Sequence, residues 1–316
     1  MNAISIVSIV CSALVLVSFA SIGAEEQHAS SRCKVTDDRA PQVSILKVGS
    51  YNILHQNGYK GTPNEWDKRK DDLVNLIRKM DLDVCGLQEV CSGQADFLTN
   101  ALPQYALVGA HREDGMRKGE ASPILYRKKR FEVVKSGTFW LSTTFDVPGS
   151  TSWGGCPRVC SWMWLKDLDA GNVFCFANTH LDLNAVAQKE GMSLIVRKMH
   201  ELVPLGMSIV FTGDHNCSEI GEPAQIVSKM LKNAMYISET APIGPWRSYN
   251  AYEWTDHDPS SVDMLKLPVD KRGCRLDYIY VSDGVRVKSY VTHGDPRPNA
   301  NLYPSDHFPV TAEVEL

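Results

Sequence analysis

Short apolar runs recur along the chain from about residue 43 onward and favour β-strands. The first of these runs, VSILKVGSYNIL at 43–54, alternates apolar and polar side chains, as a strand with one buried face does. A shorter run, DVCGLQEV at 83–90, is typical of a strand buried on both faces. The remaining predicted strands lie at about 105–110, 122–128, 131–142, 159–168, 172–181, 207–214, 275–282, 285–293 and 308–316.

Helical periodicity appears between some of these strands. The longest example is 61–83, where Thr62 is expected as N-cap, Pro63 as the first helical residue and Glu65 as the residue that closes a capping box. Other helices are expected at about 95–102, 185–202 and 222–231. The stretch 240–272 carries several Pro and Gly and predicts an elaborate loop.

The mixture of strands and helices follows no strict alternation and contains no internal repeat. It favours an α/β fold in which two packed mixed β-sheets are flanked by helices, a four-layer sandwich. A chain of 316 residues is long enough for one large domain or two small ones. Because no low-complexity linker interrupts 43–316, we expect a single domain there.

The N-terminus differs from the rest of the chain. Residues 1–24 carry no charged side chain, and an apolar stretch at 4–19 is followed by small residues, so we expect a secretory signal peptide and a secreted protein. An uncleaved signal anchor is the alternative, since the apolar stretch approaches the roughly 20 residues that span a bilayer. Residues 25–42 are polar and predict a leader. No later segment is long and apolar enough to cross a membrane.

Eight cysteines remain after the predicted signal, an even number that permits disulfides in a secreted chain. Cys85 and Cys175 lie in apolar strand-like runs, where buried free thiols are equally consistent. Cys156 and Cys160 form a C-x3-C pair, but no second pair at matching spacing supports zinc. A disulfide or free thiols are therefore favoured over a zinc site.

Polar residues recur where the predicted strands end. This group comprises Asn52, Glu89, His180, Asp182, Asp214, Asn216, Asp277, Asp306 and His307. Taken singly, each would be explained as the cap of a turn or as a buried group with a local partner. Together they suit phosphoester hydrolysis, because hard oxygen ligands favour Mg²⁺ or Mn²⁺ and an acid/base pair can activate water.

The ordered set N…LQE…NTH…GDxN…LDYI…SDH resembles the endonuclease/exonuclease/phosphatase superfamily, whose fold is like that of deoxyribonuclease I. The resemblance extends over 43–316. The segments GTFWLS, HREDG and GEASPILYRK are similar to a branch that has many bacterial secreted members, and this branch is also similar to deadenylase-type nucleases.

The resemblance implies a role for each residue that matches a family motif. Glu89, Asn52 and Asp306 would be the metal site. His307 would be the acid/base residue oriented by Asp277. His180 would contact the phosphate, with Glu120 as its carboxylate partner. Asp214 and Asn216 would position or activate the attacking water, and whether Asp214 or His307 takes the proton stays open. The expected substrate contacts are Arg112, Tyr126 and Arg158, and a structural ion pair is an equal alternative for Arg158.

Two positions depart from the family pattern. Leu54 stands where many family nucleases have an acid, so the resemblance gives weaker support to a second metal site. His215 stands inside the GDxN motif, either as an extra ligand or substrate contact or, as we favour, as a partly exposed loop histidine.

The substrate expected first is DNA or RNA, cleaved by a secreted Mg²⁺- or Mn²⁺-dependent phosphodiesterase. The net charge of −4 argues against a protein that holds nucleic acid by bulk charge, and a basic run at 127–130 gives the nuclease only local support. A sugar phosphate, phosphoinositide or phospholipid head group is the alternative. A non-enzymatic binding protein with the same fold is the third hypothesis. No stable protein partner is predicted.

Overall fold

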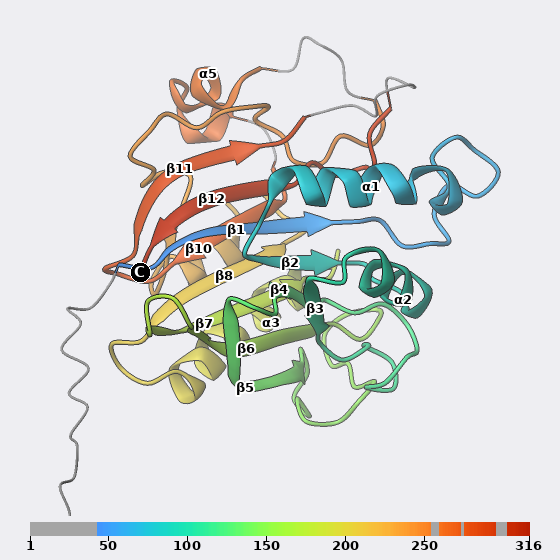
Figure 1. The fold of residues 1–316 in the computed structure, drawn as a ribbon, viewed down its shortest axis with the longest axis horizontal. Coiled ribbons are helices and arrows are strands. Elements are labelled where there is room, and N and C mark those ends of the chain that lie inside the picture. Colours follow the sequence, from blue (N-terminus) through green and yellow to red (C-terminus); the bar gives the residue numbers. More distant parts are fainter. Residues whose placement is uncertain (1–42, 254–258, 273–274, 295–301) are drawn as a thin grey trace, which may run out of the picture. The chain divides into compact units, whose positions relative to one another are not determined.

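Two six-stranded β-sheets form the centre of the fold in the computed structural model (Figure 1). The structure describes residues 43–253, 259–272, 275–294 and 302–316. The predicted signal peptide and leader, 1–24 and 25–42, lie outside these residues. Within the described part of the chain, no helix is both long and apolar enough to cross a membrane.

The first sheet has the strand order β11-β12-β1-β2-β4-β3. Its strands are β11 (Arg286–Thr292), β12 (Val310–Glu315), β1 (Ile45–Asn52), β2 (Val84–Gln88), β4 (Ile124–Arg127) and β3 (Tyr105–Val108). Strands β1 and β2 run parallel, and the other neighbours are antiparallel.

The second sheet has the order β5-β6-β7-β8-β10-β9. Its strands are β5 (Phe131–Trp140), β6 (Val159–Asp167), β7 (Val173–His180), β8 (Ser208–Asp214), β10 (Asp277–Val281) and β9 (Lys232–Asn233). Here β7 and β8 form the parallel pair. Each sheet therefore has one central parallel pair whose carboxyl ends lie side by side.

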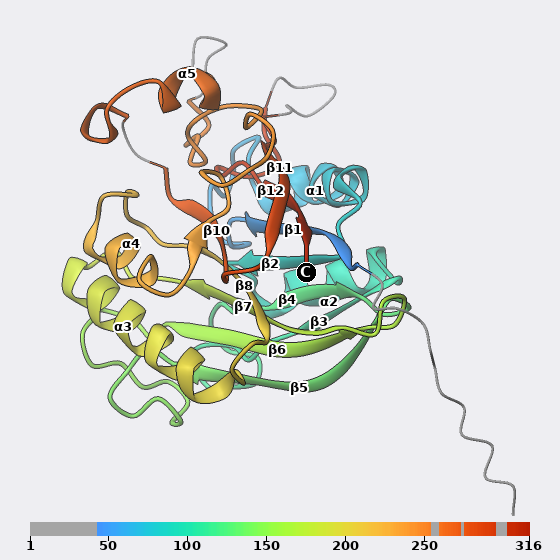
Figure 2. The same cartoon turned by 90° about the vertical axis from the view of Figure 1, so that its left-hand side faces the viewer.

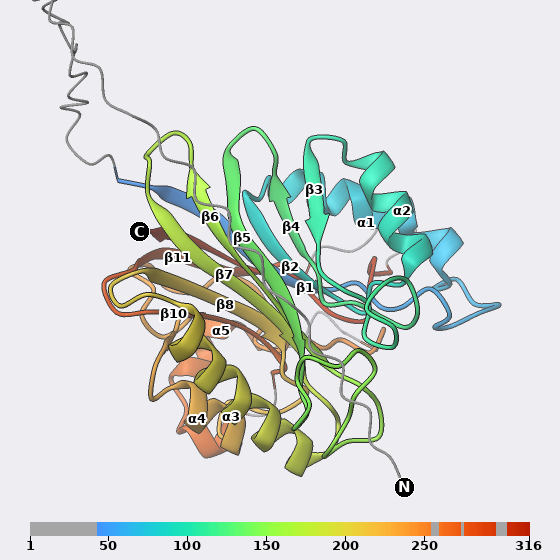
Figure 3. The same ribbon diagram turned by 90° about the horizontal axis from the view of Figure 1, so that it is seen from below.

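Helices cover the outer face of each sheet (Figures 2 and 3). The helices are α1 (Trp66–Met80), α2 (Ser92–Ala101), α3 (Ala185–Leu202), α4 (Glu222–Val227), α5 (Ser261–Leu265) and a 3-10 turn (Val269–Lys271). Helices α1 and α2 pack apolar residues on the first sheet, and α3 and α4 pack on the second. A third core fills the space between the sheets, with Val48, Val84, Phe176 and Val210 among its members. The expected α/β sandwich is confirmed.

Three helices differ in their boundaries from the prediction, and α2 begins at Ser92, earlier than expected. Helix α1 begins at Trp66, so Thr62 is not its N-cap and Pro63 is not its first helical residue. The Thr62 hydroxyl instead donates to the Tyr59 carbonyl at 2.7 Å, and Glu65 accepts from the Gly61 amide at 2.9 Å. These local bonds close a turn before the helix, which is the usual competition between short polar side chains and helical backbone. Helix α4 ends at Val227, earlier than predicted.

The cysteines at five described positions are free thiols: Cys85, Cys91, Cys156, Cys160 and Cys175. The C-x3-C pair therefore forms no disulfide. Cys160 is buried in the core beneath α3, whereas the Cys156 thiol lies 3.8 Å from an Asp182 oxygen. Cys33 and Cys274 lie outside the described residues.

A polar contact joins the two sheets below the strand ends. The Asn178 amide donates to the carbonyls of Leu87 and Pro123 at 2.7 and 3.0 Å, and its oxygen accepts from Gln88 at 2.7 Å and Thr212 at 3.1 Å. Every hydrogen-bonding atom of this buried amide is thus satisfied, as a buried polar group requires.

The sheets approach so closely at this contact that only glycine fits at position 86. A Cβ there would lie 2.2 Å from the Thr212 hydroxyl and 2.3 Å from the Asn178 oxygen. We expect Gly86→Ala to lower the free energy of unfolding by about 2–3 kcal/mol, because both partners must move. Urea denaturation measures this value. Gly155→Ala is the control, since a Cβ there meets nothing within 4 Å, and a Gly86 variant as stable as the control would contradict the expectation.

Candidate functional site

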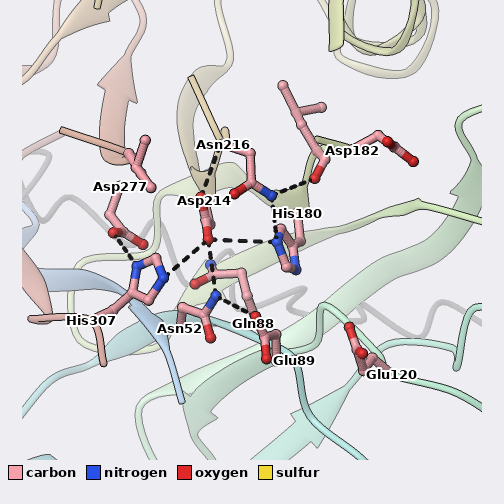
Figure 4. Close-up of polar contacts among 12 residues, drawn as sticks. Asn52, Gln88, Glu89, Glu120, His180, Asp182, Asp214, Asn216, Asp277 and His307 are labelled. Carbon is pink, nitrogen blue, oxygen red and sulfur yellow. Dashed lines mark hydrogen bonds and ion pairs between the residues drawn. The ribbon is translucent and has the colours of Figure 1, made fainter. Parts of the chain in front are cut away.

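The parallel strands of both sheets deliver polar side chains to one edge of the sandwich (Figure 4). Asn52 ends β1, and Glu89 directly follows β2. In the second sheet His180 ends β7 and is in register with Asp214 at the end of β8. Asp277 begins the antiparallel β10, also in register with Asp214. The predicted strand-end residues therefore meet because parallel strands end at the same edge.

Asp214 lies at the centre of the group and is buried. Its Oδ2 accepts from the Asn52 amide at 2.9 Å and lies 3.5 Å from His180 Nε2 and 3.7 Å from His307 Nε2. Its Oδ1 accepts from the Asn216 backbone N–H at 2.9 Å. Burial raises the pKa of Asp214 to about 7, against the charge of His307 and the hydrogen bond from Asn52. The carboxyl group is consequently more basic than an ordinary aspartate.

His307 is tied to Asp277 by a buried hydrogen bond. Nδ1 of His307 donates to Asp277 Oδ2 at 2.8 Å, and this fixes the tautomer and leaves Nε2 facing Asp214. Burial lowers the pKa of His307, but the charges of Asp277 and Asp214 outweigh it and raise the value to about 10. Among the described residues, Asp214, Asp277 and His307 are the one group of three acidic, histidine or cysteine side chains with atoms within 4.8 Å of one another. Two members of this group, Asp277 and His307, are joined by the 2.8 Å hydrogen bond.

His180 has a different partner from the one predicted. The Asn216 amide donates both to the Leu181 carbonyl and to His180 Nε2, each at 2.9 Å. The carbonyl fixes the orientation of the amide, so Nε2 must accept and the imidazole is neutral. Burial lowers the pKa of His180 well below its usual value, and the nearby charge of Arg158 lowers it further.

Glu120 does not pair with His180, and that prediction is wrong. Its two carboxylate oxygens accept from the Arg112 guanidinium at 2.7 and 3.1 Å. The two residues stand on one short loop, and the planar guanidinium matches a carboxylate at two points, which a histidine cannot do. Burial nevertheless raises the pKa of Glu120. Arg112 lies on the His180 side of the site, because its charge also lowers the pKa of that histidine.

Glu89 and Asp306 form the acidic side of the group. Glu89 has a left-handed backbone with φ of 63°, and its carboxylate accepts from the Asn52 amide at 3.0 Å and the His55 backbone N–H at 2.9 Å. Burial alone would raise the pKa of Glu89, but these two hydrogen bonds hold it below the usual value. For Asp306 burial raises the pKa, and the charge of Glu89 raises it further.

The acidic pair fits a divalent metal ion. Two neighbouring carboxylates that repel one another offer the hard oxygen donors and the negative charge that such an ion needs. Asn52 lies between Glu89 and Asp214, with its amide nitrogen toward both and its oxygen on the Leu54 backbone N–H at 3.0 Å. It therefore bridges the two acids, and its role as a metal ligand stays a prediction.

Arg158 lies beside His180 with part of its guanidinium unused. Its Nε is 3.9 Å from Asp182 Oδ2, and Nε and Nη1 are buried without a hydrogen-bond partner among the described residues. Both side chains line a small pocket with Cys156 and Gly154. Buried N–H groups without partners are costly, so a ligand oxygen here would satisfy them.

The predicted substrate contact Tyr126 lies elsewhere, and this prediction is wrong. Tyr126 pairs with Val84, the first residue of β2, whereas the site lies beyond the last residue of that strand. Its ring packs against the core between the sheets. Strand alternation shows which face a residue occupies but does not show which end of the sheet carries the site.

His215 is neither exposed nor a ligand. It is fully buried, and its ring stacks on Tyr280 at 5.7 Å and on Phe211 at 5.5 Å. Within the part of the chain that the structure describes, both ring nitrogens lack a hydrogen-bond partner, and burial lowers the pKa of His215 to about 3. The imidazole acts as an aromatic ring in the core.

Three further residues near the site were not predicted from the sequence. Arg69 is completely buried although it lies within the charged stretch DKRKDD of α1. Tyr59 and Tyr249 lie in irregular loops, where no periodic pattern distinguishes one residue from another. Each is placed at the site by tertiary contacts, which no local pattern encodes.

Comparisons with known proteins agree with this geometry. The sequence model of the Endonuclease/Exonuclease/phosphatase family matches residues 49–307. A solved structure of a protein of that family from Bacteroides thetaiotaomicron is 32% identical, with a TM-score of 0.77, and covers 87% of this chain and 99% of its own. A mannosyl-6-phosphatase from the same organism is 31% identical, with a TM-score of 0.76 and coverages of 85% and 99%. The catalytic domain of human Nocturnin, solved with a bound sulfate, shares the fold at 19% identity, a TM-score of 0.62 and coverages of 87% and 99%.

Proposed function

Because the chain belongs to the endonuclease/exonuclease/phosphatase family, whose members are metal-dependent phosphoester hydrolases, we propose that it removes phosphate from a small phosphorylated sugar with the help of Mg²⁺. The observation that carries the choice of substrate is the 31% identity to a mannosyl-6-phosphatase over 85% of the chain. The motifs alone favoured a nuclease, and a sugar phosphate was the alternative.

The basic run that supported a nuclease lies far from the site. Arg127 and Arg130 follow Tyr126, at the end of β4 that faces the start of β2. Arg127 pairs with Asp83 at 3.3 Å, and Arg130 pairs with Asp83 at 2.7 Å and Asp167 at 3.2 Å. These arginines are paired with acids of the fold, so they are no evidence for a surface that binds nucleic acid.

The proposed chemistry divides between the two sides of the site. Glu89 and Asp306 would hold Mg²⁺, which supplies positive charge to the phosphoryl oxygens and the leaving oxygen. His307, kept protonated by Asp277, would donate an N–H to the phosphate from Nε2. Asp214 would take the proton of the attacking water, because its raised pKa of about 7 suits a base near neutral pH.

The neutral side of the site would bind the phosphate and orient the water. The Asn216 amide holds His180 with Nε2 as acceptor, so the ring can donate only from Nδ1. The unpaired N–H groups of Arg158 would bind a substrate oxygen and neutralise part of its charge. Arg112, held by Glu120, would add positive charge to this side.

The proposed substrate is tested with purified protein, mannose 6-phosphate, supercoiled plasmid and single-stranded RNA, each with Mg²⁺ or with EDTA. We expect Mg²⁺-dependent release of phosphate from the sugar and no cleavage of either polymer, and His307→Ala should abolish the release. Cleavage of plasmid or RNA with no phosphate release from the sugar would replace this proposal with the nuclease.

The metal site is tested separately by thermal unfolding. We expect Mg²⁺ to raise the Tm of the EDTA-treated protein by a few degrees, since about 2.7 kcal/mol is gained at 100 times the Kd. Glu89→Gln should remove this increase because a ligand charge is lost. Glu132→Gln, an exposed change on β5, should respond as the wild type does. An unchanged response of Glu89→Gln would place the ion elsewhere.

Secretion is proposed from the sequence of residues 1–24, which lie outside the described structure. Expression with these residues should release the protein into the medium with a new N-terminus near residues 20–24. Edman sequencing or mass spectrometry of the released chain checks this expectation, and an intact N-terminus on membrane-bound protein would support the signal anchor.

A further inference from the structure

Two tyrosines stand exposed beside the acidic side of the site. Tyr59 comes from the loop after β1, and Tyr249 from the long loop before β10. Each is 39% exposed, although the surrounding site residues are largely buried. Neither tyrosine has a role in the chemistry described above.

Tyr249 contacts the segment that carries Asp306 and His307. It forms an antiparallel bridge with His307, and the centres of the two rings lie 4.9 Å apart at an angle of 55°. The backbone N–H groups of Asn250 and Ala251 donate to the Asp306 carbonyl at 2.7 and 3.1 Å. The position of the Tyr249 ring is therefore fixed relative to the acid/base residue and the proposed metal ligand.

Tyr59 reaches the same place from the opposite loop. Its backbone is left-handed with φ of 53°, and the Thr62 hydroxyl and amide both donate to its carbonyl. Its ring meets Tyr252 edge-to-face at 5.0 Å. Tyr252 directly follows Ala251, whose backbone N–H donates to the Asp306 carbonyl, so the Tyr59 ring lies near the segment that carries Asp306. Burial raises the pKa of Tyr59 and of Tyr249, and the charge of Asp306 raises both further. A left-handed backbone at a residue other than glycine costs energy, and such strain clusters at functional sites.

The charge around the two rings indicates what they would bind. Glu253 directly follows Tyr252, whose ring contacts Tyr59, and its charge also raises the pKa of both tyrosines. It therefore adds negative charge to this part of the surface. A polynucleotide would bring further phosphates against this charge, whereas a neutral sugar would not. Tyrosine offers an apolar face for the C–H groups of a sugar ring and a hydroxyl for its hydroxyls.

We propose that Tyr59 and Tyr249 form an aromatic platform that receives the ring of a hexose phosphate and so selects ring-containing sugars over open-chain alcohols. The inference rests on the proposed phosphatase activity and names the part of the substrate that the two rings recognise. The phosphate would lie at the acid/base group, and the uncharged sugar would extend over the rings.

The test compares mannose 6-phosphate with glycerol 1-phosphate, since both are esters of a primary alcohol and differ in the ring. We expect Tyr59→Ala to lower the ratio of the two kcat/KM values, mannose over glycerol, by about tenfold, with most of the loss in the KM for mannose 6-phosphate. Tyr249→Leu should lower the same ratio. Leu205→Ala is the control, because this exposed side chain lies just before β8, at the opposite end of the strand from Asp214.

Each result bears on one of the two proposals. If both substrates lose kcat/KM equally, or the ratio stays unchanged in both tyrosine variants, the platform is overturned while the phosphatase activity stands. If the wild-type protein hydrolyses neither ester, the proposed function fails and the platform fails with it.

Discussion

Replacing Asp277 with asparagine should lower kcat about 10²–10⁴-fold, the range that a positioned acid/base residue contributes. Asp277 is fully buried and accepts from His307 Nδ1 at 2.8 Å. Asparagine keeps the shape of the side chain but removes the charge that holds His307 protonated. The imidazole would then lose its proton at a lower pH. Once Nε2 is deprotonated, it has no N–H to donate to the phosphate.

The pH profile separates this effect from simple damage to the fold. Wild-type activity should fall on the alkaline side as His307 loses its proton, and in Asp277→Asn this limb should move to lower pH because the pKa of His307 is no longer raised by that carboxylate. Asp283→Asn is the control, since Asp283 is exposed just after the same strand and pairs with Lys232 at the surface. An Asp277→Asn enzyme with the wild-type kcat and the same alkaline limb would refute the role given to this pair.

The second large effect is expected at Arg69 in α1. Its Nη1 donates to the Ile53 carbonyl at 2.6 Å and the Pro304 carbonyl at 2.9 Å, and Nη2 donates to the Leu54 carbonyl at 2.6 Å. One guanidinium thus joins the segment after Asn52 to the segment before Asp306. We expect Arg69→Met to lower the free energy of unfolding by about 4 kcal/mol, because buried carbonyls are left without donors.

Lysine at position 69 tests whether the planar fork matters as well as the charge. Lys cannot reach three carbonyls from one rigid group, so Arg69→Lys should lose about 2 kcal/mol and about tenfold or more in kcat, as the proposed metal ligand moves out of place. Urea denaturation and steady-state kinetics give the two values. Arg78→Met, on the exposed face of the same helix, should change stability by less than about 1 kcal/mol. Equal losses of unfolding free energy in the Arg69 and Arg78 variants would show that the hydrogen bonds of the buried guanidinium do not stabilise the fold.

The edge at which the site lies could be predicted from sequence because polar residues directly follow apolar strands. Asn52, His180 and Asp214 each end a parallel strand, and a parallel pair can present its ends only at one edge. The pairing of Asp277 with His307 was also expected from the family motifs. The strands that carry these residues were equally visible in the alternation of apolar and polar side chains.

Pair contacts between loops could not be predicted in this way. Glu120 was assigned to His180 although Arg112, eight residues earlier, competes for it with a better-matched charge and geometry. His215 was expected at the surface, but the aromatic neighbours that bury it belong to β8 and β10. Such outcomes depend on which side chains meet in space, and neither spacing nor propensity contains that information.

The hydrogen bonds of the site also run from one sheet to the other. Asn52 of β1 binds Asp214 of β8, and His307, just before β12, binds Asp277 of β10. A phosphate or substrate that contacts both members of such a pair would hold the halves of the sandwich together, so its binding energy would oppose their separation. Amide hydrogen exchange should therefore slow in β1 and β8 together when ligand binds, although these strands belong to different sheets. The site would then stabilise the packing of the two sheets whenever a ligand is bound.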